Sequence, residues 1–399
     1  MLNIRSFSWY QNGLSWAYVC ERLVNAFDDM GHNTLVLSTN GLNEKAFKEK
    51  NKMLRSVLEL QKFGPGRAAI DLDWCYTLPP NFGQRFLANS KAKCVLYNYE
   101  TTVWPQEWKR FYHLVDYYFP SSNFSAEIFV KNGVAPHKVF VVPHGVDQKV
   151  FNAKAPKIKL NTEKSFRFVS VCAPHARKNL ELLLTAYCEA FSAADDVCLI
   201  LKTKIYKHGD GAWHQTKNIN GRKAFEIVIG DIFKKLHDRF GKNIPEIELL
   251  SGHVDNVASI YNSAHCNITT TGAEGFYLPG IESLSCGLLN IAPNYSSHLD
   301  FLNKNNSLLI DVKMRPALAV EQYWGFSPEG QIGQPSKEHA IELMIKAYRE
   351  HGSLMEKFRP EMKKVVDRYS WDAAAQTMID ATQGKIEHYI PGTYNWWPK

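Results

Sequence analysis

Short apolar runs alternate with longer segments of helical periodicity along the chain. Apolar residues recur every three to four positions in residues 15–30, which end before Gly31, and again in 44–63, so both segments predict helices. Apolar runs typical of buried strands precede, separate and follow them, at residues 2–8, 33–38, 68–74, 94–98, 117–120 and 138–142. Strands that alternate with helices are typical of parallel α/β layers.

A second series of the same kind begins at Phe166. Residues 152–164, between the two series, carry several charges and the Ala155-Pro156 break, so we interpret them as an interdomain linker. The second series predicts strands at 166–171, 197–202, 247–250 and 266–270, and helices at 180–191, 224–240, 256–264 and 279–286. A chain of 399 residues is too long for one compact core. We therefore predict an α/β protein of two Rossmann-like domains, 1–152 and 165–383, that face each other across a cleft.

Composition narrows the class of protein. The hydrophobic content of 45% excludes wholesale disorder, and the net charge of +7 permits an anionic partner without requiring one. The eight cysteines are scattered without a C-x-x-C pair, which predicts a reducing, cytoplasmic setting and no zinc site. No run of about 18 apolar residues occurs, and the first residues lack the pattern of a signal peptide, so we expect no transmembrane segment.

The best local signal is the segment 272–282, GAEGFYLPGIE, which follows a predicted strand and opens a helix at Pro279. Backbone N–H groups at a helix start form a natural site for an anion or a hydroxyl. Two carboxylates, Glu274 and Glu282, flank this loop, and Glu282 is well placed on the helix to accept two hydroxyls, such as those of a ribose. The alternative is that Glu274 is a turn residue and Glu282 a surface residue of the helix.

A second signal is the basic loop Arg177-Lys178-Asn179, again between a strand and a helix, with Asn179 as a candidate N-cap. Two cations before a helix start oppose the helix dipole, unless an anion such as a diphosphate binds there. The alternative is a solvated basic loop. Gly13, in the turn after the first strand, could let the backbone approach a phosphate or could simply form the turn.

Other patterns point away from metal and hydrolase chemistry. Asp71 and Asp73 match an acid-x-acid metal pair, but no further acidic ligands cluster nearby in the sequence, so we interpret them as residues at a strand end. No H-E-x-x-H spacing, G-x-S-x-G elbow or Walker loop occurs, which excludes the usual hydrolases and NTPases.

Taken together, these segments resemble the GT-B glycosyltransferases of family 4. The specific part is the E-x7-E segment EGFYLPGIESLSCG, and the supporting parts, in chain order, are VVPHGVDQKVF, ARKNLELLL, IYNSAHC and YSWDAAAQTMI. The resemblance implies a retaining glycosyltransferase that uses a nucleotide-diphosphate sugar and needs neither cofactor nor metal. It also implies that the C-terminal tail, residues 384–399, crosses back to the first domain, which would be the acceptor side.

The resemblance assigns roles to single residues. Lys178 matches the lysine that contacts the donor diphosphate, and Arg177 is a second cation beside it. Glu274 matches the glutamate that contacts the transferred sugar, and Glu282 the one that holds the ribose hydroxyls. Glu100 lies where many members place a residue facing the sugar on the acceptor side. Residues implied to bind the donor through their backbone are Gly13, Gly275, Phe276, Tyr277 and Leu278.

Three positions depart from the family pattern. Ala173 stands where an arginine is common five residues before the lysine, so Arg177 would have to replace that charge. Tyr277 replaces a glycine that would allow the closest approach to the donor, and His265 replaces an acidic residue. The two glutamates and the lysine are all present, so we expect an active enzyme.

The sequence leaves open both the acceptor substrate and the choice between a transferase and a binding protein. Segments 44–67 and 202–223 carry seven and six basic residues, against three and one acidic, and suit a glycan, a lipid-linked glycan, a modified nucleic acid or an anionic surface. Both segments could equally be solvated loops. The alternative to a transferase is a two-lobed protein that binds a sugar or nucleotide sugar without turning it over. A third possibility is a sugar phosphorylase or a nucleotide-sugar epimerase of related architecture.

Overall fold

The computed structural model describes residues 1–8, 10, 15–38, 69–77, 79–84, 86, 89–203, 219–252, 254–318, 321 and 326–394. Their contacts divide the chain into two compact units. Unit 1 comprises Met1–Tyr99, Val103–Gly145 and Arg368–Asn395, and the body of unit 2 comprises Glu100–Thr102 and Val146–Asp367.

Unit 1 is built on a parallel sheet in the order β2-β1-β3-β4-β5. Its strands are β1 (Asn3–Ser8), β2 (Asn33–Ser38), β3 (Leu72–Tyr76), β4 (Lys93–Leu96) and β5 (Tyr117–Phe119). The α-helices described in this unit are α1 (Ser15–Asp29), α3 (Asn123–Lys131) and α10 (Trp371–Thr382). The strand predicted at 138–142 is reduced to a parallel bridge between Val139 and Tyr118.

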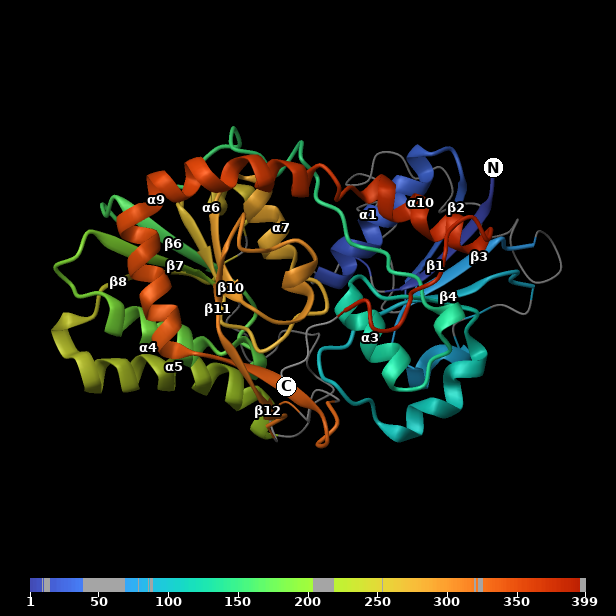
Figure 1. Ribbon diagram of the computed structural model, residues 1–399, viewed down its shortest axis with the longest axis horizontal. Coiled ribbons are helices and arrows are strands. Elements are labelled where there is room, and N and C mark those ends of the chain that lie inside the picture. The colour runs from blue at the N-terminus through green and yellow to red at the C-terminus, as the bar shows by residue number, and fades with distance from the viewer. Residues whose placement is uncertain are drawn as a thin grey trace. The chain divides into compact units, whose positions relative to one another are not determined.

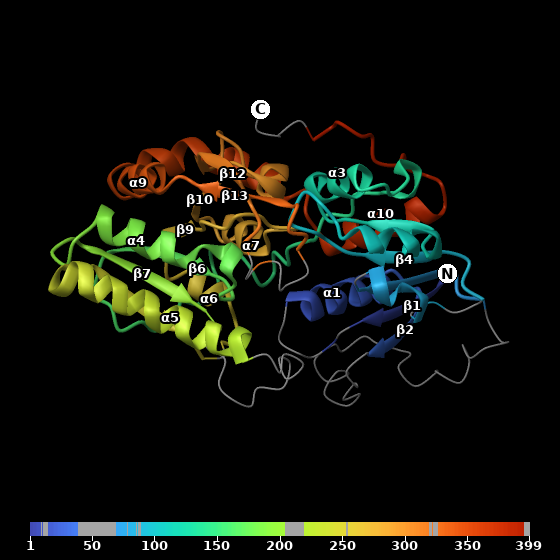
Figure 2. The same cartoon turned by 90° about the horizontal axis from the view of Figure 1, so that it is seen from below.

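Unit 2 is built on a six-stranded parallel sheet in the order β11-β10-β9-β6-β7-β8. Its strands are β6 (Phe166–Val171), β7 (Val197–Lys202), β8 (Glu246–Leu250), β9 (Cys266–Ile268), β10 (Leu289–Pro293) and β11 (Leu308–Ile310). Its α-helices in the described residues include α4 (Leu180–Ala190), α5 (Ile219–Phe240), α6 (Ala258–Tyr261), α7 (Leu278–Ser285) and α9 (Lys337–Val366). A hairpin of β12 (Val312–Pro316) and β13 (Gln331–Pro335) extends this unit. Figure 2 shows α4 and α5 beside β7.

The chain returns to unit 1 earlier than predicted, at Arg368 and not at 384. Helix α10 lies beside α1 (Figure 1), because the Trp371 ring makes an edge contact with Tyr18 and lies nearly parallel to His144. A Cβ on Gly145 would lie 2.2 Å from the backbone nitrogen of Trp371, so only a glycine fits there. Residues 143–145 (PHG) and 369–372 (YSWD) of two sequence motifs therefore meet inside unit 1.

The segment predicted as a linker, 152–164, lies within unit 2 and is bound to its surface. The buried carboxylate of Glu248 on β8 accepts hydrogen bonds from the backbone N–H groups of Asn161 and Thr162. The side chain of Asn262 donates to the carbonyl oxygens of Asn152 and Ala155. These bonds fix the segment, which therefore does not behave as a free connection.

Candidate active site

Both sequence motifs lie at the switch point of the unit 2 sheet. Strands β6 and β9 are neighbours, but the chain continues from β6 outward through β7 and from β9 outward through β10. Ligands of open α/β sheets bind at this point, beyond the carboxyl ends of the strands. The loop after β6 carries the 3-10 helix η4 (Ala176–Lys178), and the loop after β9 runs from Thr269 to Tyr277.

Backbone contacts join these two loops. The Gly272 N–H donates to the Arg177 carbonyl oxygen over 2.6 Å. The side chain of Asn179 donates to the Thr270 carbonyl oxygen over 3.0 Å, with Asn179 itself in the left-handed region at φ 51°. Asn179 is thus at the start of α4 as predicted, but its side chain joins the loops and makes no capping bond to the helix.

Glu274 is the centre of a charge cluster. Its Oε1 atom accepts a hydrogen bond from Lys178 Nζ, and its Oε2 atom lies 2.9 Å from Arg177 Nη1. Only 6% of the Glu274 side chain is exposed. Burial alone would raise the pKa of this carboxyl, but Arg177 and Lys178 lower it to about 2. Glu274 is therefore ionised at any physiological pH.

Glu100 joins the same cluster through Arg177. Its Oε1 atom lies 3.2 Å from Arg177 Nη2, and its side chain is 20% exposed. Burial raises the pKa of Glu100 above its ordinary value, although Arg177 opposes this shift. Burial and the neighbouring Arg177 together lower the pKa of Lys178. Four of the predicted residues thus meet in one network of two cations and two carboxylates.

A support for Glu274 was not predicted from the sequence. The Glu274 N–H donates to Ser296 Oγ over 3.0 Å, and Ser296 itself has a positive φ of 66°. His298 Nδ1 lies 2.6 Å from the Tyr295 carbonyl oxygen, which can only accept, so this nitrogen carries the proton. Burial lowers the pKa of His298 to about 4 and keeps the ring neutral. The segment SSH has no spacing that would have marked these residues beforehand.

Tyr277, which stands where the resemblance would place a glycine, turns its side chain into the core. Its hydroxyl accepts a hydrogen bond from the Asn267 side chain on β9, and only 3% of the residue is exposed. The ring occupies the space beside Gly280, where an added Cβ would lie 2.3 Å from a Tyr277 ring atom. Because the Tyr277 ring lies in the core, it does not cover the backbone of the loop. The Leu278 N–H donates to the Phe276 carbonyl oxygen within the loop.

Glu282 lies on α7 as predicted, but it is buried. Its Oε2 atom accepts a hydrogen bond from the Tyr261 hydroxyl on α6 over 3.1 Å, and the residue is 8% exposed. Burial raises the pKa of Glu282 to about 8, although the bond from Tyr261 lowers it. The alternative that Glu282 is an exposed helix residue is therefore wrong.

The two aspartates of the acid-x-acid pattern have other partners. Both Asp73 oxygens accept from the Arg5 guanidinium over 2.8 Å, inside the sheet of unit 1. Asp71 pairs with Lys91 Nζ at 2.7 Å. Neither carboxylate lies in the Glu274 cluster, and no group of three or more His, Cys, Asp and Glu side chains in the described residues could hold a metal ion.

Several predicted features fall outside the described residues: Gly13, the basic segment 44–67, and residues 204–218 of the segment 202–223. Among the helices that the structure describes, none combines the length and the apolar character needed to cross a membrane.

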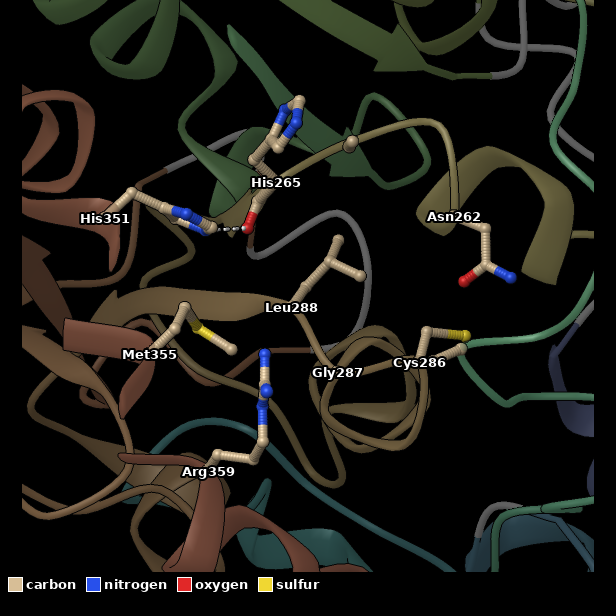
Figure 3. A pocket seen from close by; sticks show the side chains of 10 residues that line it. Asn262, His265, Cys286, Gly287, Leu288, His351, Met355 and Arg359 are labelled. Carbon is tan, nitrogen blue, oxygen red and sulfur yellow. Dashed lines mark hydrogen bonds between the residues drawn. The ribbon is translucent and has the colours of Figure 1, made fainter. Parts of the chain in front are cut away.

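A separate pocket of about 200 Å³ lies in unit 2, beside the amino ends of β9 and β10. Figure 3 shows the Arg359 side chain reaching into it and the His351 ring at its wall, where Nε2 lies 3.2 Å from the His265 carbonyl oxygen. Its lining includes none of the residues predicted to bind the donor. This pocket is therefore not the candidate active site.

The sequence matches no protein-family model, and no curated protein matches it. Solved structures share the fold over nearly the whole chain. A glycosyltransferase from Rickettsia africae is 12% identical, with a TM-score of 0.64 over 96% of this chain and 98% of its own. HepE from Anabaena, in complex with UDP and glucose, is 11% identical, with a TM-score of 0.66 over 96% and 100%. A UDP-forming α,α-trehalose-phosphate synthase from Burkholderia xenovorans is 10% identical, with a TM-score of 0.67 over 96% and 99%.

These similarities confirm the predicted fold class, an α/β protein with two Rossmann-like domains of the GT-B type.

Proposed function

We propose that the protein is a retaining glycosyltransferase of the family 4 type, which transfers a sugar from a nucleotide-diphosphate donor to an acceptor hydroxyl. One observation carries the proposal: the buried carboxylate of Glu274 is held by Arg177 and Lys178 at the switch point of the sheet. The fold that the chain shares with HepE, which binds UDP and glucose, supports it.

The cations would act on the leaving group. Cleavage of the anomeric C–O bond builds negative charge on the diphosphate and positive charge on the sugar. Arg177 and Lys178 precede α4, with Asn179 between Lys178 and the helix, and would stabilise the diphosphate in the place of a metal ion. Glu274 would lie beside the sugar, where its fixed negative charge favours the cationic sugar of the transition state.

Glu282 would bind the ribose of the nucleotide. Its carboxyl group already accepts one hydrogen bond from Tyr261, and the ribose hydroxyls would add two more. Backbone N–H groups of Gly275, Phe276 and Tyr277, just before α7, would bind the sugar or phosphate.

Retention follows if the acceptor attacks from the side that the leaving group vacates. The acceptor oxygen then bonds to the anomeric carbon as the C–O bond to the diphosphate breaks. The acceptor proton passes to the leaving phosphate oxygen, so no separate base is required. The acceptor class, a glycan, a lipid-linked glycan or a modified nucleic acid, and a cytoplasmic setting complete the proposal.

Donor hydrolysis tests the proposal. The purified protein is incubated with UDP-glucose, UDP-N-acetylglucosamine and GDP-mannose in EDTA, and release of the nucleoside diphosphate is measured. We expect slow hydrolysis of one donor, unchanged by EDTA and abolished in Glu274→Gln. Binding of a donor without any turnover would favour the sugar-binding alternative, and strict dependence on Mg²⁺ or Mn²⁺ would contradict the metal-free mechanism.

The stereochemical part of the proposal has its own measurement. Once an acceptor is found, NMR of the product's anomeric proton is expected to show an α linkage from an α-linked donor. A β linkage would overturn retention.

A further inference from the structure

Arg177 is shared between two carboxylates. Its Nη1 atom lies 2.9 Å from Glu274 Oε2, and its Nη2 atom lies 3.2 Å from Glu100 Oε1. Lys178 pairs with the other oxygen of Glu274. The two cations and two carboxylates neutralise each other, so a diphosphate gains the full charge of Arg177 only if one of these ion pairs opens.

Glu100 is the partner that can be displaced. Glu274 contacts both cations and is 6% exposed, and its backbone is held by Ser296. Glu100 has one contact with Arg177, which is longer, and is 20% exposed. Opening the Glu100 pair therefore costs less than opening the Glu274 pair.

Glu100 is nevertheless held in a defined place by the β12–β13 hairpin. The Thr102 N–H donates to the Gln331 carbonyl oxygen, and the Gln331 N–H donates to Thr102 Oγ1 over 2.9 Å. A Cβ on Gly330 would lie 2.9 Å from Thr101 Oγ1, so the hairpin packs tightly on this segment.

The same hairpin also positions the loop that holds Arg177. The Gly333 N–H donates to the Gly272 carbonyl oxygen over 3.0 Å, and Gly272 in turn donates to the Arg177 carbonyl oxygen. The backbone segments that carry Glu100 and Arg177 are thus both joined to the same strand, β13. Their ion pair is therefore a fixed part of the site and not a chance contact of two surface side chains.

We propose that Glu100 is the counter-ion of Arg177 in the donor-free protein, and that the donor's diphosphate replaces Glu100 on Arg177. This inference rests on the proposed function. The displaced carboxylate takes one proton from the solvent and becomes a neutral carboxylic acid. No unpaired charge then remains beside the bound diphosphate.

The charged groups that face Glu100 among the described residues are Arg177 and Lys178 of η4 and Glu274 of the loop before α7. Burial raises the pKa of Glu100, Arg177 and Lys178 lower it, and Glu274 raises it. Loss of Arg177 to the diphosphate, together with the new negative charge, raises this pKa further. The donor-bound protein therefore binds more protons at Glu100, and this residue makes the affinity rise as the pH falls.

Calorimetry of UDP-glucose binding tests the inference, in two buffers of different ionisation enthalpy so that proton uptake can be counted. The variant is Glu100→Gln. The matched control is Glu189→Gln on α4, because Glu189 also pairs with an arginine, Arg239, and its side chain is 18% exposed. GDP-mannose is measured in parallel.

We expect Glu100→Gln to bind the donor about tenfold more tightly than the wild type at neutral pH, because the competing carboxylate is gone. We also expect it to take up fewer protons, by up to about one per donor. Glu189→Gln should match the wild type in donor affinity and in proton uptake. In an Arg177→Gln background, or Arg177→Met if that variant does not fold, Glu100→Gln should change the affinity less than twofold.

Equal or weaker donor binding by Glu100→Gln, with an unchanged proton count, would overturn the inference and leave the proposed function intact. A wild type and a Glu100→Gln variant that bind neither UDP-glucose nor GDP-mannose would overturn both, because the donor site itself would be missing.

Discussion

At the scale of the residue, we expect Lys178 to contribute to donor turnover in a way that a surface lysine does not. Its Nζ atom is bound to Glu274 in the cluster at the switch point. We predict that Lys178→Ala lowers kcat of donor turnover by about two to three orders of magnitude, because one preorganised charge aimed at the leaving group is lost. Steady-state kinetics measure this.

The control for that variant is Lys235→Ala on α5, whose side chain pairs with Glu181 and is 63% exposed. Lys235→Ala should retain the wild-type rate. If Lys178→Ala retained it too, Lys178 would be only an ion-pair partner of Glu274, without a role in turnover.

Glu282 should make the stability of the donor-free protein depend on pH. The unfolded carboxyl loses its proton near its ordinary pKa of 4.5, whereas the folded one holds it up to about 8. Between these values the folded state binds more protons, so stability falls as the pH rises. We predict that Glu282→Gln reduces this loss by about 1–3 kcal/mol between pH 5 and 8, measured by urea unfolding. Parallel stability curves for the two proteins would show that Glu282 ionises normally.

At the scale of the element, α7 depends on the fit between Tyr277 and Gly280. A Cβ on Gly280 would lie 2.3 Å from the Tyr277 ring, which is itself fixed by Asn267. We predict that Gly280→Ala destabilises the protein by about 1–3 kcal/mol through overpacking. Chemical denaturation measures the change in the free energy of unfolding.

Gly352→Ala on α9 is the matched control, because nothing lies within 4 Å of the added Cβ. This substitution should leave stability unchanged or raise it by up to about 1 kcal/mol. If both variants had the same stability, the Tyr277 ring would have to move aside without cost.

The sequence predicted elements best where periodicity and burial agree. Strands 166–171 and 197–202 match β6 and β7 residue for residue, because apolar residues predominate in both segments and turns bound them. The helix predicted over 256–264 shrinks to Ala258–Tyr261. For the site, the sequence marked Arg177, Lys178, Glu274 and Glu282, which stand in distinctive motifs.

What the sequence did not reveal depends on tertiary contacts. The ion pair of Glu100 with Arg177 joins positions 77 residues apart, and no local pattern records it. The positive φ of Ser296 and the burial of Glu282 are likewise set by packing, so spacing alone left Glu282 open as a surface residue.

At the scale of the whole molecule, unit 1 is completed by the segment after α10. The Tyr389 hydroxyl donates to the buried carboxylate of Glu127 on α3 over 2.8 Å, and the Tyr389 N–H donates to the Val139 carbonyl oxygen. Figure 1 shows this segment passing beside α3. We predict that Tyr389→Phe destabilises unit 1 by about 1–2 kcal/mol, because a buried acceptor loses its donor.

Hydrogen exchange of the backbone amides shows which regions Tyr389→Phe destabilises. Protection should fall in α3 and around Val139 of unit 1 and stay unchanged in α4 of unit 2. The control is Tyr348→Phe on α9, whose ring packs on Phe166 and Phe191. This substitution should leave the protection of α3, of the region around Val139 and of α4 unchanged. A uniform loss of protection over both units would contradict a local role for the Tyr389 hydroxyl.

The early return of the chain at Arg368 also sets an order of events during synthesis on the ribosome. The strands of unit 1 emerge first, yet the helix that packs on α1 is translated only after Asp367. Unit 2, whose described strands all precede Asp367, can complete its sheet before α10 is made. The unit whose translation begins first therefore receives its last helix only after the strands of unit 2 are made, and the face of α1 at Tyr18 lacks its partner until Trp371 leaves the exit tunnel.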